Sequence, residues 1–182
     1  MHHLPLTYQQ TIFNTIAGKI TTPDFETWLY AHPELEGYIG PERYLSLISF
    51  RFKTDSRYNL IKILEAVIDM GEYETHKLLS RLKEAQTLIP GLPELLELFY
   101  YQYCDGYYFL QKVALGQGLS VVIHKENGNA EFEITPASFE ELQTDIAQVI
   151  QWIAEKKIVL TGTRDNLNRL EYIDQREPYD RE

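Results

Sequence analysis

Apolar side chains recur at helical spacing through residues 25–52, FETWLYAHPELEGYIGPERYLSLISFRF, and short Pro and Gly signals divide the run. Residues three and four positions apart share one face of an α-helix, and Phe25, Trp28 and Leu29 form such a face. Residues 40–42, GPE, favour a new helix start, because proline is tolerated in the first helical turn. The segment therefore predicts two or three short packed helices, which commits this part of the chain to a helical architecture.

A strong break follows this helical first half, at residues 89–93, IPGLP. Before the break, apolar residues at helical spacing predict three more helices, over residues 8–16, 60–71 and 78–85. Two prolines and a glycine so close together favour a hinge or a tight turn. The sequence therefore predicts a helical subdomain at residues 1–88 and an α+β subdomain at residues 93–182, packed together as one compact unit.

The period of the apolar pattern changes in the second half. Apolar residues alternate over residues 119–123 and again over residues 130–134, which is the period of a β-strand. Between these runs lies Asn127-Gly128, and both residues tolerate the positive φ of a tight hairpin turn. We therefore expect a hairpin centred on Asn127-Gly128. Its inward side chains would be Phe132 and Ile134, and its solvent-facing side chains would be Glu131 and Glu133.

A long helix and one more strand candidate complete the second half. Thr135-Pro136 is typical of a helix start, since threonine caps the N-terminus and proline fits the first turn. Apolar residues then continue at helical spacing to Ile153, and the short apolar run at residues 158–160 favours a strand. The predicted fold class is α+β: a mainly helical N-terminal part followed by a β-hairpin or small antiparallel sheet packed with a long helix.

The chain is acidic. It has 17 Lys and Arg against 27 Asp and Glu, a formal net charge of −10. Such a field repels a phosphate backbone, and no basic cluster extends beyond Lys156-Lys157, so we expect no nucleic-acid binding. The same charge attracts a basic protein partner. It also serves the simpler purpose of keeping a protein in solution.

The single cysteine, Cys104, excludes an intramolecular disulfide. It lies in an aromatic helical run with no histidine close in sequence, which favours a small buried apolar side chain over a nucleophile. No N-terminal apolar region resembles a signal peptide, and no apolar run approaches membrane-spanning length. We therefore expect a cytoplasmic protein that does not enter a membrane.

Patterns associated with catalysis or metal binding each lack a necessary partner. Residues 116–118, GQG, have no third glycine of a dinucleotide fingerprint and favour a turn. Residues 32–34, HPE, and 124–126, HKE, match the H-x-E of zinc deaminases, which require further cysteines. Glu72 and His76 share a helix face, and a metal bridged by them would need a second such pair. We therefore expect no catalytic residue, no metal and no cofactor.

A candidate binding surface lies on the helix expected after residue 93. Projection at the helical period places Leu95, Leu96, Phe99 and Tyr103 on one face and places four polar residues, Glu94, Glu97, Tyr101 and Asp105, on the opposite face. A tyrosine in an acidic stripe can anchor a partner, because it buries a large area at a low cost in rotamer entropy, and carboxylates attract a cationic surface. These four residues are the predicted partner-binding site. The simpler interpretation is a solvated helix face with one incidental tyrosine.

One family likeness rests on an aromatic packing pattern that comprises Trp28, Leu35-Glu36, Tyr44, Leu47-Ile48, Phe52, residues 103–107 (YCDGY) and Phe109-Leu110. Over about half the chain, this pattern resembles the small helical immunity proteins of bacterial polymorphic-toxin systems. The resemblance implies a cytoplasmic, non-catalytic protein that binds and neutralises a cognate toxin domain. It carries over no binding residue, because the matching positions belong to a core and such interfaces lie on variable surface.

The predicted function is therefore a non-catalytic protein-binding module, an immunity or inhibitor protein that neutralises a cognate bacterial toxin domain by occlusion. The expected partner is a basic protein. One alternative is a regulatory or scaffold protein that uses the same surface for another partner. Another is an enzyme of unfamiliar type, which would need a polar cleft and a residue of perturbed pKa. The sequence does not define the oligomeric state.

Overall fold

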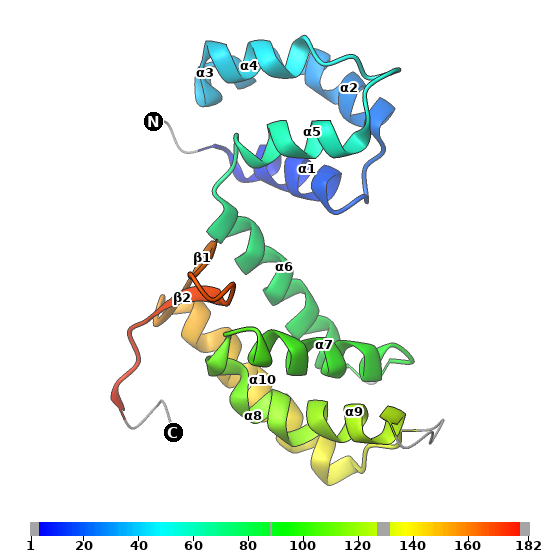
Figure 1. Ribbon diagram of the computed structural model, residues 1–182, viewed down its shortest axis with the longest axis vertical. Helices are drawn as coiled ribbons and strands as arrows, with labels where there is room; N and C mark the ends of the chain where they lie inside the picture. The colour runs from blue at the N-terminus through cyan, green and yellow to red at the C-terminus, as the bar shows by residue number, and fades with distance from the viewer. Residues whose placement is uncertain (1–3, 88, 127–131, 179–182) are drawn as a thin grey trace. The chain divides into compact units, whose positions relative to one another are not determined.

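The computed structural model describes residues 4–87, 89–126 and 132–178 (Figure 1). The chain divides into two compact units, Met1–Asp69 and Met70–Glu182. The described part is mostly helical and has one two-stranded antiparallel sheet, so the predicted α+β class is confirmed. Each unit has its own apolar core, and each is described by itself.

The described part of the first unit is helical, as predicted. Its elements are α1 (Leu6–Ile16), α2 (Thr22–Ala31), α3 (Leu35–Ile39), α4 (Pro41–Ile48) and α5 (Arg57–Glu65). Their apolar faces meet in one core, whose fully buried members are Ile12, Phe25, Leu29, Leu35, Leu47, Leu60 and Leu64. Burial of these aliphatic and aromatic side chains is the main stabilising term for helices this short.

Local signals set where these helices begin and how they connect. The side chain of Thr21 caps α2 by accepting a hydrogen bond from the Asp24 amide at 3.3 Å. Arg57, at the start of α5, donates from Nη2 to the carbonyl oxygens of Thr15 (2.9 Å) and Ile16 (3.1 Å). These carbonyls end α1, and that of Thr15 also accepts from the Gly18 amide at 3.1 Å, so the arginine adds to the capping of α1 and ties α5 to it.

The second unit begins with a long helix and ends with the sheet. Its described elements are α6 (Met70–Ala85), α7 (Leu92–Cys104), the 3₁₀ turn η1 (Tyr108–Leu110), α8 (Gln111–Val113), the π-helical turn η2 (Ala114–Gly118), α9 (Leu119–Glu126), α10 (Pro136–Ala154), β1 (Ile158–Arg164) and β2 (Leu170–Asp174). The predicted start of α10 is confirmed, because the Thr135 side chain accepts a hydrogen bond from the Ser138 amide at 3.2 Å. Helix α7 packs against η2 and α9, and α10 packs against α6 and α8 (Figure 1).

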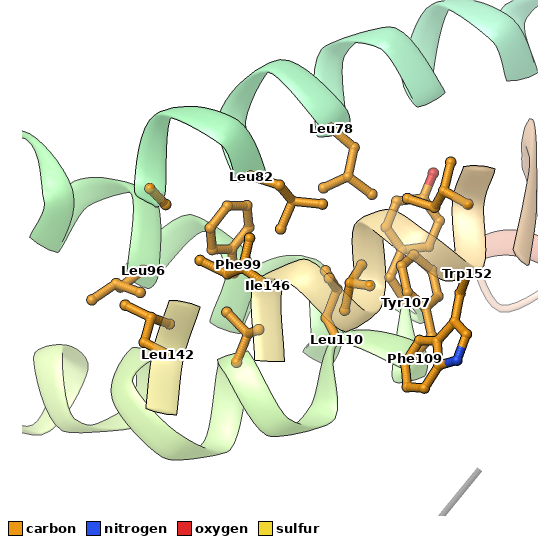
Figure 2. Packing of buried hydrophobic residues seen from close by; sticks show 14 of the residues in the cluster. Leu78, Leu82, Leu96, Phe99, Tyr107, Phe109, Leu110, Leu142, Ile146 and Trp152 are labelled. Atoms are coloured by element: carbon orange, nitrogen blue, oxygen red, sulfur yellow. The ribbon is translucent and has the colours of Figure 1, made fainter. Parts of the chain in front are cut away.

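Figure 2 shows the core of the second unit, where side chains from α6, α7, α10 and the η1–α8 segment converge. Leu82 of α6, Phe99 of α7 and Ile146 of α10 are each 0% exposed. Ile158 and Leu160 of β1 belong to the same cluster, so the sheet closes one end of this core. Leu142, Ile146 and Ile153 lie on the inward face predicted for the long helix.

The break at residues 89–93 lies inside the second unit. Leu78, Leu82 and Ala85 of α6 share one core with Leu92 and Leu96 of α7. The segment therefore acts as a turn between two helices that pack on each other, and the division between units falls earlier, between Asp69 and Met70. The boundary seen in the structure differs from the predicted one because side-chain packing, rather than Pro and Gly content, defines a compact unit.

The hairpin predicted over residues 119–134 is wrong. Residues 119–126 form helix α9, and the described residues 132–135 are not in a strand. The predicted turn Asn127-Gly128 and residue Glu131 lie outside the described residues. Val121 and Val122 are both buried while Ile123 is 45% exposed, an order that fits a helix and not a strand. Alternation over residues 119–123 is weak evidence for a strand, because the run is short and Val122 is apolar where a polar, solvent-facing residue was expected.

Two side chains predicted to face inward, Phe132 and Ile134, do so although the segment is not a strand. Phe132 and Ile134 are partly buried against the core of the second unit, whereas Glu133 is exposed. These side chains therefore point as the alternation predicted. Their backbone runs as an irregular segment into α10.

The antiparallel sheet instead joins β1 to β2, and residues 158–160 are in a strand as predicted. Ile158 lies opposite Asp174, and Leu160 lies opposite Tyr172. Gly162, with φ 71°, brings β1 against the start of α6: a Cβ added there would lie 2.5 Å from the carbonyl carbon of Met70. Glycine is therefore required for this close approach of strand to helix.

The turn predicted at residues 116–118 is also wrong, because these residues belong to the π-helical turn η2. A Cβ added at Gly118 would lie 2.7 Å from the carbonyl oxygen of Leu96. The glycine therefore allows close packing of η2 on α7. A single π-helical turn within a run of helix re-phases the residues that follow it.

A buried arginine closes the end of the sheet. Arg176 is 6% exposed, and its guanidinium donates from Nε and Nη2 to the two carboxylate oxygens of Asp174, at 3.0 and 2.8 Å. The guanidinium carbon also lies 4.5 Å from the centre of the Trp152 ring of α10, a cation–π contact. The segment just after β2 is thus held to the long helix.

Replacing Arg176 with alanine is expected to lower the free energy of unfolding of the second unit by about 2 kcal/mol, because it removes a bidentate ion pair and uncovers Trp152. Arg176→Lys should recover only part of the loss, since lysine keeps the charge but not the planar two-donor geometry. Urea denaturation, monitored by hydrogen exchange of the α10 amides, measures the stability of both variants. Equal midpoints for Arg176→Ala and the wild type would contradict this role.

Candidate partner-binding surface

Helix α7 carries the predicted binding residues on its outward side. It buries Leu92, Leu96 and Phe99 in the core. On the opposite side, Glu94 and Asp105 are exposed, Tyr101 is 51% exposed and Glu97 is half-buried. The structure therefore brings the four predicted residues onto one face, as the helical projection indicated.

Two of the three carboxylates on this face have cationic partners from other elements. Lys125 of α9 forms an ion pair with Glu97, and Arg164 of β1 lies 3.9 Å from Asp105. The hydrogen bond to Glu97 raises the pKa of Lys125, and Glu94 and Tyr101 act in the same direction against partial desolvation. Sequence reasoning missed Lys125 because α9 was expected to be a strand.

Exposed aromatic and sulfur groups lie near the C-terminal end of α7. The ring of Tyr101 packs edge-on against Tyr100 at 5.7 Å, and Cys104 is exposed three residues after Tyr101. The ring of Tyr108, which is 47% exposed, packs edge-on at 5.8 Å against Tyr103 on the other side of the helix. We call the set Glu94, Glu97, Tyr101, Cys104 and Asp105 the α7 surface.

The exposure of Cys104 corrects the expectation that it is a small buried apolar residue. That expectation followed from the aromatic composition of the run. The helical phase decides otherwise, because Cys104 lies three residues after Tyr101 and so shares its outward face. The position of the thiol could have been found from the same projection that placed Tyr101.

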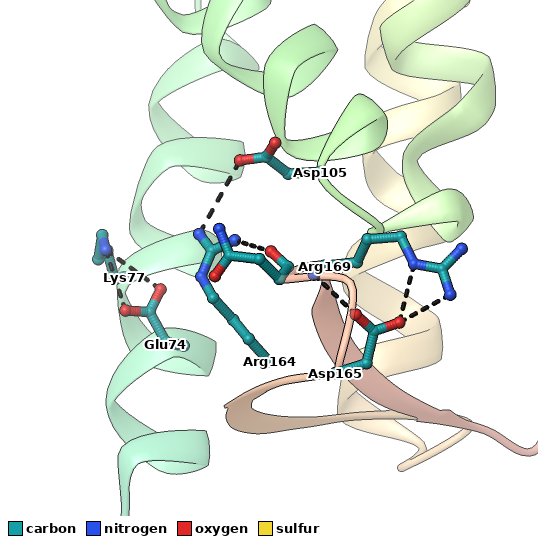
Figure 3. A network of polar contacts seen from close by, with 7 residues as sticks. Glu74, Lys77, Asp105, Arg164, Asp165 and Arg169 are labelled. Carbon is teal, nitrogen blue, oxygen red and sulfur yellow. Dashed lines mark hydrogen bonds and ion pairs between the residues drawn. The ribbon is translucent and has the colours of Figure 1, made fainter.

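The turn between β1 and β2 holds the C-terminal end of α7. The Leu170 amide donates to the carbonyl oxygen of Asp105 at 2.6 Å. Figure 3 shows Asp165 beneath the turn, where it accepts from Arg169 Nε at 2.8 Å, and Arg164 reaching toward Asp105. Hydrogen bonds from the Arg169 amide and guanidinium lower the pKa of Asp165. The α7 surface is therefore supported by a well-bonded turn rather than by a loose loop.

The two H-x-E histidines have local structural roles. Nδ1 of His32 lies 2.8 Å from the carbonyl oxygen of Trp28, and Nδ1 of His124 lies 2.9 Å from that of Ser120. A carbonyl oxygen only accepts, so each Nδ1 carries a proton and bonds to the residue four positions earlier. His32 also stacks on Trp28, with ring centroids 4.8 Å apart. Each ring is thus held by the preceding turn of its own helix.

An aromatic and polar cluster lies beside His32 in the first unit. Tyr8 donates a short hydrogen bond to the Glu34 carboxylate, which raises the pKa of Tyr8 to about 12 and lowers that of Glu34. The Tyr8 ring also meets Trp28 and Tyr38 edge-on, at 5.6 and 5.8 Å. Rings in direct contact fill the space between them, so the cluster joins α1 to α2 and α3.

Within residues 4–87, 89–126 and 132–178, no three His, Cys, Asp or Glu side chains gather in a way that could hold a metal ion. None of the helices described there combines the length and the apolar character needed to cross a bilayer. Comparison with protein-family models, with curated proteins and with solved structures finds no match.

Proposed function

We propose that the protein is a non-catalytic binding module, an immunity protein that works in the cytoplasm and neutralises a basic toxin domain by covering its functional surface. The observation that carries the proposal is Tyr101, a half-exposed tyrosine between the exposed carboxylates of Glu94 and Asp105. Tyrosine is enriched at interfaces because its ring buries area while its hydroxyl keeps a polar contact. The likeness to immunity proteins supports the same choice.

The distribution of charge supports a basic partner for the second unit. That unit has 11 Lys and Arg against 19 Asp and Glu, a net charge of −8, whereas the first unit has 6 against 8, a net charge of −2. The acidic excess therefore lies mainly in the unit that carries the α7 surface. Long-range attraction from such a field raises the association rate with a cationic protein and weakens as salt is added.

Occlusion needs no cofactor and no reacting group on this chain. The partner would be held by burial of Tyr101 at the centre of the contact and oriented by the carboxylates at its edge. Rim charges of this kind act mainly on the association rate, whereas a buried aromatic anchor acts mainly on the dissociation rate. The two contributions can therefore be measured separately.

Replacing Tyr101 with alanine is expected to weaken binding of the toxin domain by about 2 kcal/mol, roughly 30-fold, chiefly through faster dissociation. The partner for this test is a toxin candidate encoded beside this gene. Surface plasmon resonance across a salt series measures both rate constants. Tyr58→Ala is the matched control, because Tyr58 is 65% exposed in the first unit and lies outside the α7 surface.

Growth during co-expression decides between immunity and other binding roles. An immunity protein rescues cells that express the toxin domain. Binding without rescue would favour a regulatory or scaffold protein, and the absence of both would contradict the proposal. If Tyr101→Ala rescues growth and binds as well as the wild type does, the immunity function is retained and the interface lies on another face.

A further inference from the structure

One ammonium group of this chain is already paired with a carboxylate of the α7 surface. Lys125, in the last turn of α9, is paired with Glu97 across a separation of 28 residues in sequence. Glu94, exposed one turn earlier on α7, also attracts this ammonium and acts to raise its pKa. Two carboxylates of one helix face thus act on a single cation that belongs to this chain.

We propose that Lys125 takes the place of a cationic side chain of the partner, and that an arginine of a basic protein displaces it from Glu97 on binding. This inference rests on the proposed function, since it specifies which contact the partner makes. It goes further in assigning Lys125 a competing role, so that removing this lysine improves binding instead of harming it.

The ion pair between Lys125 and Glu97 is exposed enough to exchange. The Lys125 side chain is 46% exposed and that of Glu97 is 25% exposed. Pairs of this kind contribute little to stability, because water solvates both ions well when they separate. An incoming cation therefore replaces a weak contact, and Lys125 can return to solvent on its flexible stem.

Arginine fits this place better than lysine does. Its planar guanidinium can form two hydrogen bonds with the Glu97 carboxylate and can also lie against an aromatic ring. The Tyr101 ring is supported from one side by Tyr100, with ring planes at 64°, so its orientation is largely set before binding. A second cationic side chain would meet Glu94, which is exposed one turn earlier on the same face.

The chemistry of the surface favours a basic protein over an anionic ligand. Besides Glu97, this region exposes Glu94 on α7 and Glu126, the residue after Lys125, and Tyr101 adds a polar hydroxyl without positive charge. An anion at Lys125 would have to displace Glu97 while facing these two carboxylates. A cation meets attraction from all of them.

A blocked tetra-arginine peptide, titrated at low salt and followed by amide chemical shifts, tests the subsite in the full-length protein. We expect shift changes centred on residues 94–105 in the wild type. Lys125→Gln should tighten peptide binding by about two- to fivefold, the range that loss of an exposed competing pair allows. Glu97→Gln should weaken it, and a tetra-lysine peptide should bind less tightly than tetra-arginine.

The control variant is Lys83→Gln, because Lys83 is exposed on α6 and its replacement changes the net charge by the same amount. A smaller gain in Lys83→Gln than in Lys125→Gln would assign the effect to this position. Equal gains in the two variants would reduce the effect to net charge and overturn the proposal. Shift changes centred away from residues 94–105 would overturn it as well.

The peptide assay and the growth assay fail independently. If the peptide binds as expected but the neighbouring toxin is not neutralised, the arginine subsite is supported and the immunity function is wrong. If the protein rescues growth but Lys125→Gln binds peptide and toxin no better than Lys83→Gln does, the immunity function is supported and the proposed displacement of Lys125 is wrong. Circular dichroism of each variant confirms that the fold is unchanged.

Discussion

Gly162→Ala is expected to lower the free energy of unfolding of the second unit by about 3 kcal/mol or more. Gly162 has φ 71°, a conformation that costs alanine on the order of 1–2 kcal/mol. The added Cβ would lie 2.5 Å from the carbonyl carbon of Met70, 2.6 Å from its Cβ and 2.7 Å from the Gly71 amide nitrogen. Main-chain atoms of a helix cannot turn aside, so β1 must separate from α6 and draw Ile158 and Leu160 partly out of the core.

Gly116→Ala is the matched control, because no heavy atom lies within 4 Å of a Cβ added there and its φ is not in the left-handed region. Alanine at such a site is neutral or stabilises slightly, since it reduces the entropy of the unfolded chain. Urea denaturation, monitored by hydrogen exchange of the β1 amides, measures the stability of both variants. If Gly162→Ala unfolds at the same urea concentration as Gly116→Ala, the contact between β1 and α6 is looser than described.

Phe99→Ala is expected to destabilise the second unit by about 3–5 kcal/mol, while Tyr101→Ala on the same helix changes stability by less than about 0.5 kcal/mol. Phe99 is 0% exposed in the core of Figure 2, and its truncation leaves a cavity between α6, α7 and α10. Tyr101 is 51% exposed and its ring contacts Tyr100. Calorimetric unfolding of the two variants measures the difference.

The same two substitutions separate loss of fold from loss of binding. Phe99→Ala should weaken partner binding only as far as it unfolds the second unit, and Phe99→Leu, which keeps most of the volume, should restore both stability and binding. Tyr101→Ala should lose binding while its melting temperature is retained. A large drop in stability for Tyr101→Ala would contradict the assignment of this ring to the surface.

Much of the helical architecture follows from short-range sequence signals. Apolar spacing and the Thr135 cap predicted α10, and the same reasoning predicted the helices of residues 25–52 and the outward face of α7. These features depend on residues within a turn or two of one another, so a single stretch of sequence contains the information. The position of Tyr101 opposite Phe99 is of this kind.

The strands of this protein could not be predicted from short-range sequence patterns alone. Residues 119–123 alternate like a strand, yet they continue a helix that begins before them and bury Val121 and Val122 together. Residues 161–164, TGTR, contain no apolar side chain that would predict a strand, yet they belong to β1 because the strand pairs with β2 and α6 packs beside Gly162. The energy that selects the strand comes from residues distant in sequence.

The sequence by itself determined the α+β class, the acidic charge and the helix face that holds Glu94, Glu97, Tyr101 and Asp105, because composition and helical phase are local properties. Only the tertiary structure decided that the first unit ends at Asp69, and that Glu97 pairs with Lys125 and Asp105 with Arg164. Each of these depends on which elements pack together. The partners of a side chain across a tertiary contact are set by the packing of the whole core, which no single stretch of sequence contains.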